Sequence, residues 1–212
     1  LFYGACEQCL KAVVVFSNRY ADQAERQSEN CNDEKRREEL LKIARICRRV
    51  PEHPAETFYE AVQSVHFLTY CLTANPLRYL YIQQFQLGRP DRYFQRFYEN
   101  DLKTGAITPY EAQTLLDCLA IQINRRVVHG LSSGYMVGGR DENGIVVSNE
   151  ITKMSMRVVE QCRLVYPSVG LRLPDAIFSI PPQPVSHRPR IDGSPFCTQG
   201  NYRQISLNLQ IP

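Results

Sequence analysis

This 212-residue chain lacks the patterns of several functional classes, and each absence argues against one of them. No apolar run approaches the roughly 20 residues that a membrane-spanning helix needs, so we expect no membrane partner. The densest basic run, 35–37, is flanked by acidic residues and predicts a solvated helix face, which argues against a nucleic-acid partner. The first residues show no basic and apolar leader, so no secretory signal is predicted.

Metal-ligand and disulfide patterns are also missing. The histidines lie far apart with no second ligand at helical spacing, so we predict no metal site. The eight cysteines form no framework, and without an export signal they predict a reducing compartment, the cytoplasm. Cys6 and Cys9 form a C-x-x-C inside an expected helix, where we predict packing rather than a redox or metal role. The histidines are His53, His66, His129 and His187.

What the sequence does contain is typical of a globular protein rich in helices. A hydrophobic content of 43% is enough for a core in one domain or two small ones. The clearest helix start is Thr108 followed by Pro109 and Glu111, which predicts a capping box. Apolar spacing predicts helices over 1–30, 33–49, 55–73, 92–102, 108–126 and 148–163.

Other helix ends carry weaker signals. Either Asn32 or Asp33 is the expected N-cap of the second helix, which should end before Pro51. Pro54 is expected to open the third helix and Ser148 to cap the last one.

Strand signals are few. We predict strands over 135–139 and 169–173, and a hairpin in which the Asn-Gly turn at 141–144 leads to a returning strand over 145–147. The segment 77–87 could be a buried strand or a loop through the interior. The segment 88–91 is expected to be a turn, in which Arg89 and Asp91 pair with each other or with nearby backbone.

Two polar motifs are candidates for function. Gln83, Gln84 and Gln86 interrupt an apolar stretch, and if that stretch is buried their amides need partners. The hydrogen-bond partner of these amides could be backbone, buried water or a substrate. We take Gln84 and Gln86 as the substrate-binding candidates. The G-x-S-x-G run around Ser132 resembles a nucleophile elbow, but a strand is expected after it instead of the helix that the elbow requires.

The composition changes after residue 173. Residues 174–212 hold seven of the thirteen prolines, no Glu or Lys, and no helical period, which predicts a poorly ordered, loop-like tail. We therefore divide the chain into a domain over 1–173 and a divergent tail over 174–212.

An ordered series of short motifs runs through the first 173 residues. It comprises the segments 19–21, 36–44, 54–63, 88–93, 97–102, 105–108, 138–144 and 149–152, among them Gly-Arg-Pro-Asp-Arg-Tyr and Phe-Tyr-Glu-Asn-Asp-Leu. This series resembles the glycyl radical enzymes, the pyruvate formate-lyase family with its dehydratase and lyase relatives. No single motif decides the resemblance, which covers about residues 3 to 173.

The resemblance implies a fold and a chemistry. The fold would be α/β and helix-rich, part of a ten-stranded α/β barrel. A separate S-adenosylmethionine radical activase installs a glycyl radical in these enzymes, which passes to a loop cysteine that abstracts hydrogen from the substrate. The implied parent is a formate acetyltransferase, radical dehydratase or lyase, active under anaerobic conditions on a small polar substrate, and a homodimer. The chain itself is expected to bind no cofactor.

The departures from the family pattern limit the prediction. The 212 residues contain no Gly-Cys-x-Glu loop and no radical-glycine motif, and Cys197 matches neither. The family commonly has tryptophan where this chain has His66 and Ala120, and its Asn-Gly-His-Ser segment would fall on 81–84, where it is not preserved. We therefore assign no catalytic residue and expect an enzyme fragment that is inactive alone. The alternative is a non-catalytic helical interaction protein.

Overall fold

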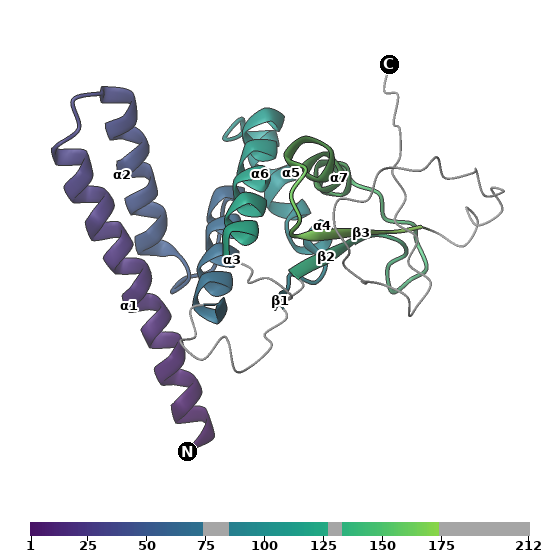
Figure 1. Ribbon diagram of the computed structural model, residues 1–212, viewed down its shortest axis with the longest axis horizontal. Helices are drawn as coiled ribbons and strands as arrows, with labels where there is room; N and C mark the ends of the chain where they lie inside the picture. The colour runs from purple at the N-terminus through teal and green to yellow at the C-terminus, as the bar shows by residue number, and fades with distance from the viewer. Residues whose placement is uncertain (74–84, 127–132, 174–212) are drawn as a thin grey trace.

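The computed structural model describes residues 1–73, 85–126 and 133–173. Two long helices form a hairpin at one end of the molecule, and shorter helices and a small sheet form a body at the other (Figure 1). The predicted tail 174–212, residue Gln84 and the candidate nucleophile Ser132 lie outside the described residues. Among the described helices, none combines the length and apolar character that crossing a bilayer would require.

The hairpin consists of α1 (Phe2–Glu29) and α2 (Glu34–Arg49). Of the two predicted caps, Asp33 is the one used: its carboxylate accepts the backbone N–H groups of Lys35 (3.0 Å) and Arg36 (3.4 Å). The buried side chains of α1 are Ser17, Ala21, Ala24 and Ser28. The predicted packing of Cys6 and Cys9 is wrong, because both are exposed on the first turns of α1, which extend beyond the contact with α2.

Aromatic side chains attach the hairpin to α3 (Phe58–Thr73). Phe16 of α1 stacks on Tyr70 with ring centroids 4.9 Å apart and meets Phe67 edge to face at 6.1 Å. The start of α3 predicted at Pro54 is wrong by three residues. Thr57 and Glu60 form a capping box there, since each accepts the other's backbone N–H at 3.2 Å.

The predicted helix 92–102 is two helices, α4 (Pro90–Tyr93) and α5 (Gln95–Thr104). Pro90 therefore begins a helix within the segment expected to be a turn. Gly105 closes α5, in the left-handed conformation with φ 71°. The next helix, α6 (Pro109–Arg126), has the predicted bounds, and the Glu111 carboxylate accepts the Thr108 backbone N–H at 2.8 Å.

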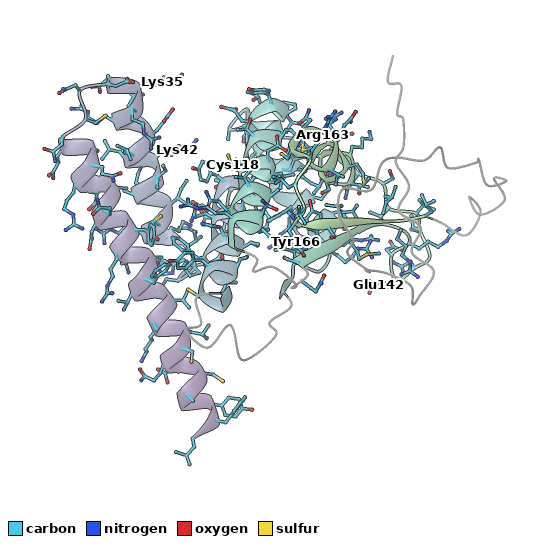
Figure 2. All side chains as sticks on the ribbon, viewed as in Figure 1. Lys35, Lys42, Cys118, Glu142, Arg163 and Tyr166 are labelled. Atoms are coloured by element: carbon cyan, nitrogen blue, oxygen red, sulfur yellow. The ribbon has the colours of Figure 1, made fainter. Side chains whose placement is uncertain are left out.

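Three strands form a parallel sheet in the order β1-β2-β3 within the described residues. They are β1 (Phe85–Gln86), β2 (Ser133–Gly138) and β3 (Ser168–Arg172), so both predicted strands at 135–139 and 169–173 are confirmed within two residues. The predicted returning strand 145–147 is wrong: a single antiparallel bridge joins Arg140 to Val146. Glu142, labelled in Figure 2, lies in the turn between them.

The last helix, α7 (Glu150–Cys162), is capped by Asn149 and not by Ser148. The Asn149 side chain accepts the Thr152 N–H at 2.9 Å, and the Thr152 hydroxyl accepts the Asn149 N–H at 3.3 Å. The helices and the sheet of the body share one core, whose largest fully buried side chains include Phe58, Phe94, Ile123, Ile151, Met154 and Val137. A second, smaller cluster with Ala21, Ala44 and Phe67 lies between the hairpin and α3.

Candidate functional site

The two faces of the sheet carry different side chains. Leu87 beyond β1, Tyr135 and Val137 of β2, and Val169 and Leu171 of β3 pack into the helical core. Successive strand residues point to opposite faces, so the intervening residues point away from that core. Figure 1 shows α6 and α7 together on one side of the strands. The second face, as we call the other side, comprises Gln86, Gly134, Met136, Gly138, Ser168, Gly170 and Arg172.

Strand register arranges the second face in rows. Gln86 pairs with Gly134, which pairs with Ser168, and Met136 pairs with Gly170. A Cβ on Gly134 would lie 2.4 Å from the Ser168 carbonyl oxygen, so this position admits only glycine. The strand beside Gln86 therefore has no side chain at this row, and Gly134 itself is buried.

Gln86 is exposed, and its amide makes no hydrogen bond with the described residues. The premise that its stretch is buried therefore does not hold at this residue within the present chain. An exposed amide with no described partner can bind a ligand, so Gln86 stays a substrate-binding prediction, as does Gln84. The glycines at alternate strand positions were the signal in the sequence that could have revealed this face.

A buried polar cluster fixes the carboxyl end of β2. The Asp91 carboxylate, fully buried, accepts the Gly138 N–H at 2.7 Å and the Thr152 hydroxyl at 3.4 Å. Arg89 donates to the Asp91 carboxylate (3.4 Å from Nε) and to the Gly138 carbonyl oxygen, and Asn149 donates to the Asp91 carbonyl oxygen at 2.6 Å. The predicted pairing of Arg89 with Asp91 and backbone is confirmed. We call this cluster the Asp91 lock.

Two tyrosines between the sheet and the helices are held in the neutral form. Burial raises the pKa of Tyr135 to about 12, against a smaller opposing effect of a hydrogen bond with Ser155. Burial also raises the pKa of Tyr93, whose hydroxyl donates to the Leu87 carbonyl oxygen at 3.0 Å. Both phenols therefore stay neutral at neutral pH, because ionising either would cost desolvation energy, and the Tyr93 hydroxyl acts as a structural donor.

The described thiols with a shifted pKa are all shifted upward. Burial raises the pKa of Cys47 to about 11, and burial raises those of Cys71, Cys118 and Cys162 as well. A nucleophilic cysteine needs the opposite shift. Within the described ranges, no three His, Cys, Asp or Glu side chains converge on a position suited to a metal ion. The residue after Ser132 begins β2, so a strand follows this motif where the elbow needs a helix.

The geometry defines a helix-rich α/β unit with a parallel sheet covered by helices on one face. A model of the family described as pyruvate formate lyase-like matches residues 1–177, and the chain belongs to this family of glycyl radical enzymes. It is 33% identical to a glycyl radical enzyme of known structure from Archaeoglobus fulgidus, with a TM-score of 0.71 over 79% of this chain and 23% of that one.

The names of two curated relatives show which reactions similar members of the family catalyse. Trans-4-hydroxy-L-proline dehydratase of Clostridioides difficile is 29% identical over 76% of this chain and 22% of its own length. Isethionate sulfite-lyase of Bilophila wadsworthia is 29% identical over 76% of this chain and 21% of its own length. A structure from Roseburia inulinivorans concerned with 1,2-propanediol dehydration has a TM-score of 0.67 at 33% identity. The chain thus spans about a fifth of the length of these relatives.

Proposed function

We propose that this chain forms part of the wall of a ten-stranded glycyl radical enzyme barrel, and that the enzyme is a dehydratase or lyase acting on a small polar molecule. Family membership and the activities named for the relatives support the reaction class. Formate acetyltransferase chemistry and anaerobic metabolism remain predictions from the resemblance. The parallel strands β1, β2 and β3, with helices on one side, are compatible with one sector of such a barrel.

The observation that carries the proposal is the position of Gln86 on the second face. Its amide is exposed and has no partner among the described residues, and its neighbour in the register, Gly134, carries no side chain that could pair with it. In the proposed enzyme this face lines the barrel interior, where Gln86 and Gln84 bind polar groups of the substrate. The radical supplies hydrogen abstraction, and these residues of the chain hold and orient the molecule.

The associated components are part of the same proposal. A separate S-adenosylmethionine radical activase forms the glycyl radical in the enzyme, a homodimer in the cytoplasm, whereas the residues described here bind no cofactor. The domain ends near residue 173, a boundary that the matched range 1–177 supports. These 212 residues tested by themselves should show no turnover, because the sequence matches neither the cysteine loop nor the radical-glycine motif of the family.

The test uses the full-length enzyme that contains this chain, activated without oxygen by its activase. Electron paramagnetic resonance should detect an organic radical. Gln86→Leu should then raise KM about tenfold with radical yield and kcat unchanged, as expected when one amide hydrogen bond to a substrate is lost. Gln161→Leu, an exposed position on α7, is the matched control. An unchanged KM in Gln86→Leu would remove Gln86 from the site.

A second outcome would favour the non-catalytic alternative. If the intact protein forms no radical, and the 212-residue chain is a monomer that melts cooperatively, the helices serve as an interaction scaffold. A slice of a barrel should instead associate, because its strand edges and apolar faces are uncovered. Sedimentation and calorimetry of the purified chain distinguish the two.

A further inference from the structure

Arg172 is the last residue of β3 and lies on the second face, paired in register with Gly138. The aliphatic part of its side chain packs against the backbone of Gly139. A Cβ on Gly139 would lie 2.8 Å from Cδ and 3.0 Å from Cγ of Arg172. Gly138 and Gly139 both have positive φ, 78° and 77°, a conformation that favours glycine. The backbone at this end of β2 thus takes an unusual path that leaves room for the stem of Arg172.

The platform beneath Arg172 is held rigidly. The Asp91 lock binds both the N–H and the carbonyl oxygen of Gly138, and the Gly139 carbonyl oxygen accepts the Val147 N–H at 2.7 Å. A side chain whose stem rests on a fixed backbone loses less entropy when its head binds a ligand. Arg172 is therefore preorganised although it is exposed.

The arginines near this end of the sheet differ in their hydrogen-bond partners. Arg89 is bonded to the Asp91 carboxylate and to Gly138, and Arg140 Nη1 donates to the Gly144 carbonyl oxygen at 2.7 Å. The Arg172 guanidinium, by contrast, makes no hydrogen bond or ion pair in the described part of the chain. Asp91 already accepts four donors, so no described carboxylate at this position offsets the charge of Arg172.

We propose that Arg172 is an anion subsite that binds the carboxylate or sulfonate of a small substrate at the carboxyl end of the sheet. Ligands of parallel sheets bind at the carboxyl ends of strands, and the planar guanidinium matches the paired oxygens of such groups. The Arg172 row lies four residues beyond the Gln86 row, about 13 Å along the strands, and the two residues stand on the outer strands β3 and β1, so their substitutions test separate contacts. This inference rests on the proposed function and specifies its substrate class.

The test measures binding to the unactivated full-length enzyme by calorimetry, so that no radical is required. The anionic probes are isethionate and 4-hydroxyphenylacetate, and the neutral probe is 1,2-propanediol. Arg172→Gln should weaken anion binding about 10- to 100-fold, with Arg172→Lys intermediate and the neutral probe unaffected. Arg125→Gln, at an exposed position on α6, removes the same charge elsewhere and should change nothing.

Each other outcome has a distinct meaning. Binding of 1,2-propanediol alone, or anion binding that survives Arg172→Gln, overturns the anion subsite and leaves the proposed function standing. Equal loss of anion and diol binding together with a lower Tm also overturns it, because Arg172 would then pair with a carboxylate elsewhere in the full-length fold. If none of the probes binds, the proposal that the enzyme acts on a small polar substrate is contradicted, and the anion subsite is contradicted as well.

Discussion

The α1–α2 hairpin and the helix–sheet body bury side chains of different average size. In the hairpin α1 buries the small residues Ser17, Ala21, Ala24 and Ser28, and α2 adds Leu40 and Ile46, whereas the larger core of the body includes Phe58 and Met154. Hydrophobic stabilisation grows with the apolar area removed from water, so the body should hold most of the folding free energy. Aromatic contacts of Phe16 and Tyr20 with α3, and a buried cluster that joins Ala44 and Cys47 of α2 to Phe67, attach the hairpin to the body. Removing a buried side chain from the body should therefore cost much more than removing an exposed ion pair from the hairpin.

The largest effect is expected in the body, at the Asp91 lock. Asp91→Ala removes the acceptor of the Gly138 N–H and leaves Arg89 without its ion partner, which should cost about 3 kcal/mol. Hydrogen exchange of the β2 amides, followed by mass spectrometry, should show faster opening than in the parent protein. Glu142→Ala, in the exposed turn nearby, is the control and should exchange at the parental rate. Slow exchange in Asp91→Ala would contradict the structural role of the lock.

The next effect concerns the second face. Gly134→Ala places a methyl group 2.4 Å from the Ser168 carbonyl oxygen, and a backbone oxygen cannot rotate away. The strands β2 and β3 must separate, at a cost of about 2 kcal/mol. Gly144→Ala is a contrasting control: its Cβ meets no atom within 4 Å, although its φ of 78° adds some strain. Exchange of β3 amides should rise in Gly134→Ala alone, and equal behaviour of the two variants would disprove the close approach.

A smaller effect is expected where body helices join. The Asp101 carboxylate, buried, accepts the Phe58 N–H at 2.7 Å and so caps α3 from α5. Asp101→Ala should destabilise the body by about 1 kcal/mol, a typical value for a lost cap. Thermal melting monitored by circular dichroism measures the change. Asp101→Asn retains an acceptor oxygen and should recover part of the loss, which a purely steric role would not allow.

Local signals allowed some of these elements to be predicted. The capping box at Thr108 and Glu111 is contained in four adjacent residues, so the start of α6 was predicted correctly. The start of α3 was missed because Pro54 is the more obvious signal, although Thr57 and Glu60 form the box. The Asp91 lock joins residues 47 and 61 positions apart, and strand register is set by tertiary packing. Sequence spacing carries no information on such pairs, so the contact of Asp91 with Gly138 could not be predicted, whereas the alternating glycines of β2 were an unused local signal for the second face.

At the exposed ion pairs of the hairpin we expect effects too small for a melting experiment. Arg48 of α2 bridges Asp22 (2.6 Å) and Glu25 (2.8 Å) of α1, but all three side chains are largely exposed. Solvent and salt screen such pairs, so Arg48→Gln should leave Tm within experimental error. Ala21→Leu, in contrast, inserts a large side chain at a fully buried hairpin position and should open α1 from α2. If Arg48→Gln matched Ala21→Leu, the hairpin would depend on its ion pairs.

The smallest effect is a pH dependence at the start of α6. Hydrogen bonds from the Thr108 backbone and hydroxyl lower the pKa of Glu111 in the folded protein. Because this pKa lies below its unfolded value, the stabilisation is present above the unfolded pKa and is lost as pH falls through the folded one. Exchange of the first α6 amides should therefore accelerate relative to the intrinsic rate between about pH 5 and pH 3. Glu111→Gln should remove most of that dependence, whereas Glu99→Gln on α5 should retain it, since Glu99 contacts Gln95 and lies outside the cap. An unchanged profile in Glu111→Gln would show that other carboxyl groups control the opening of α6.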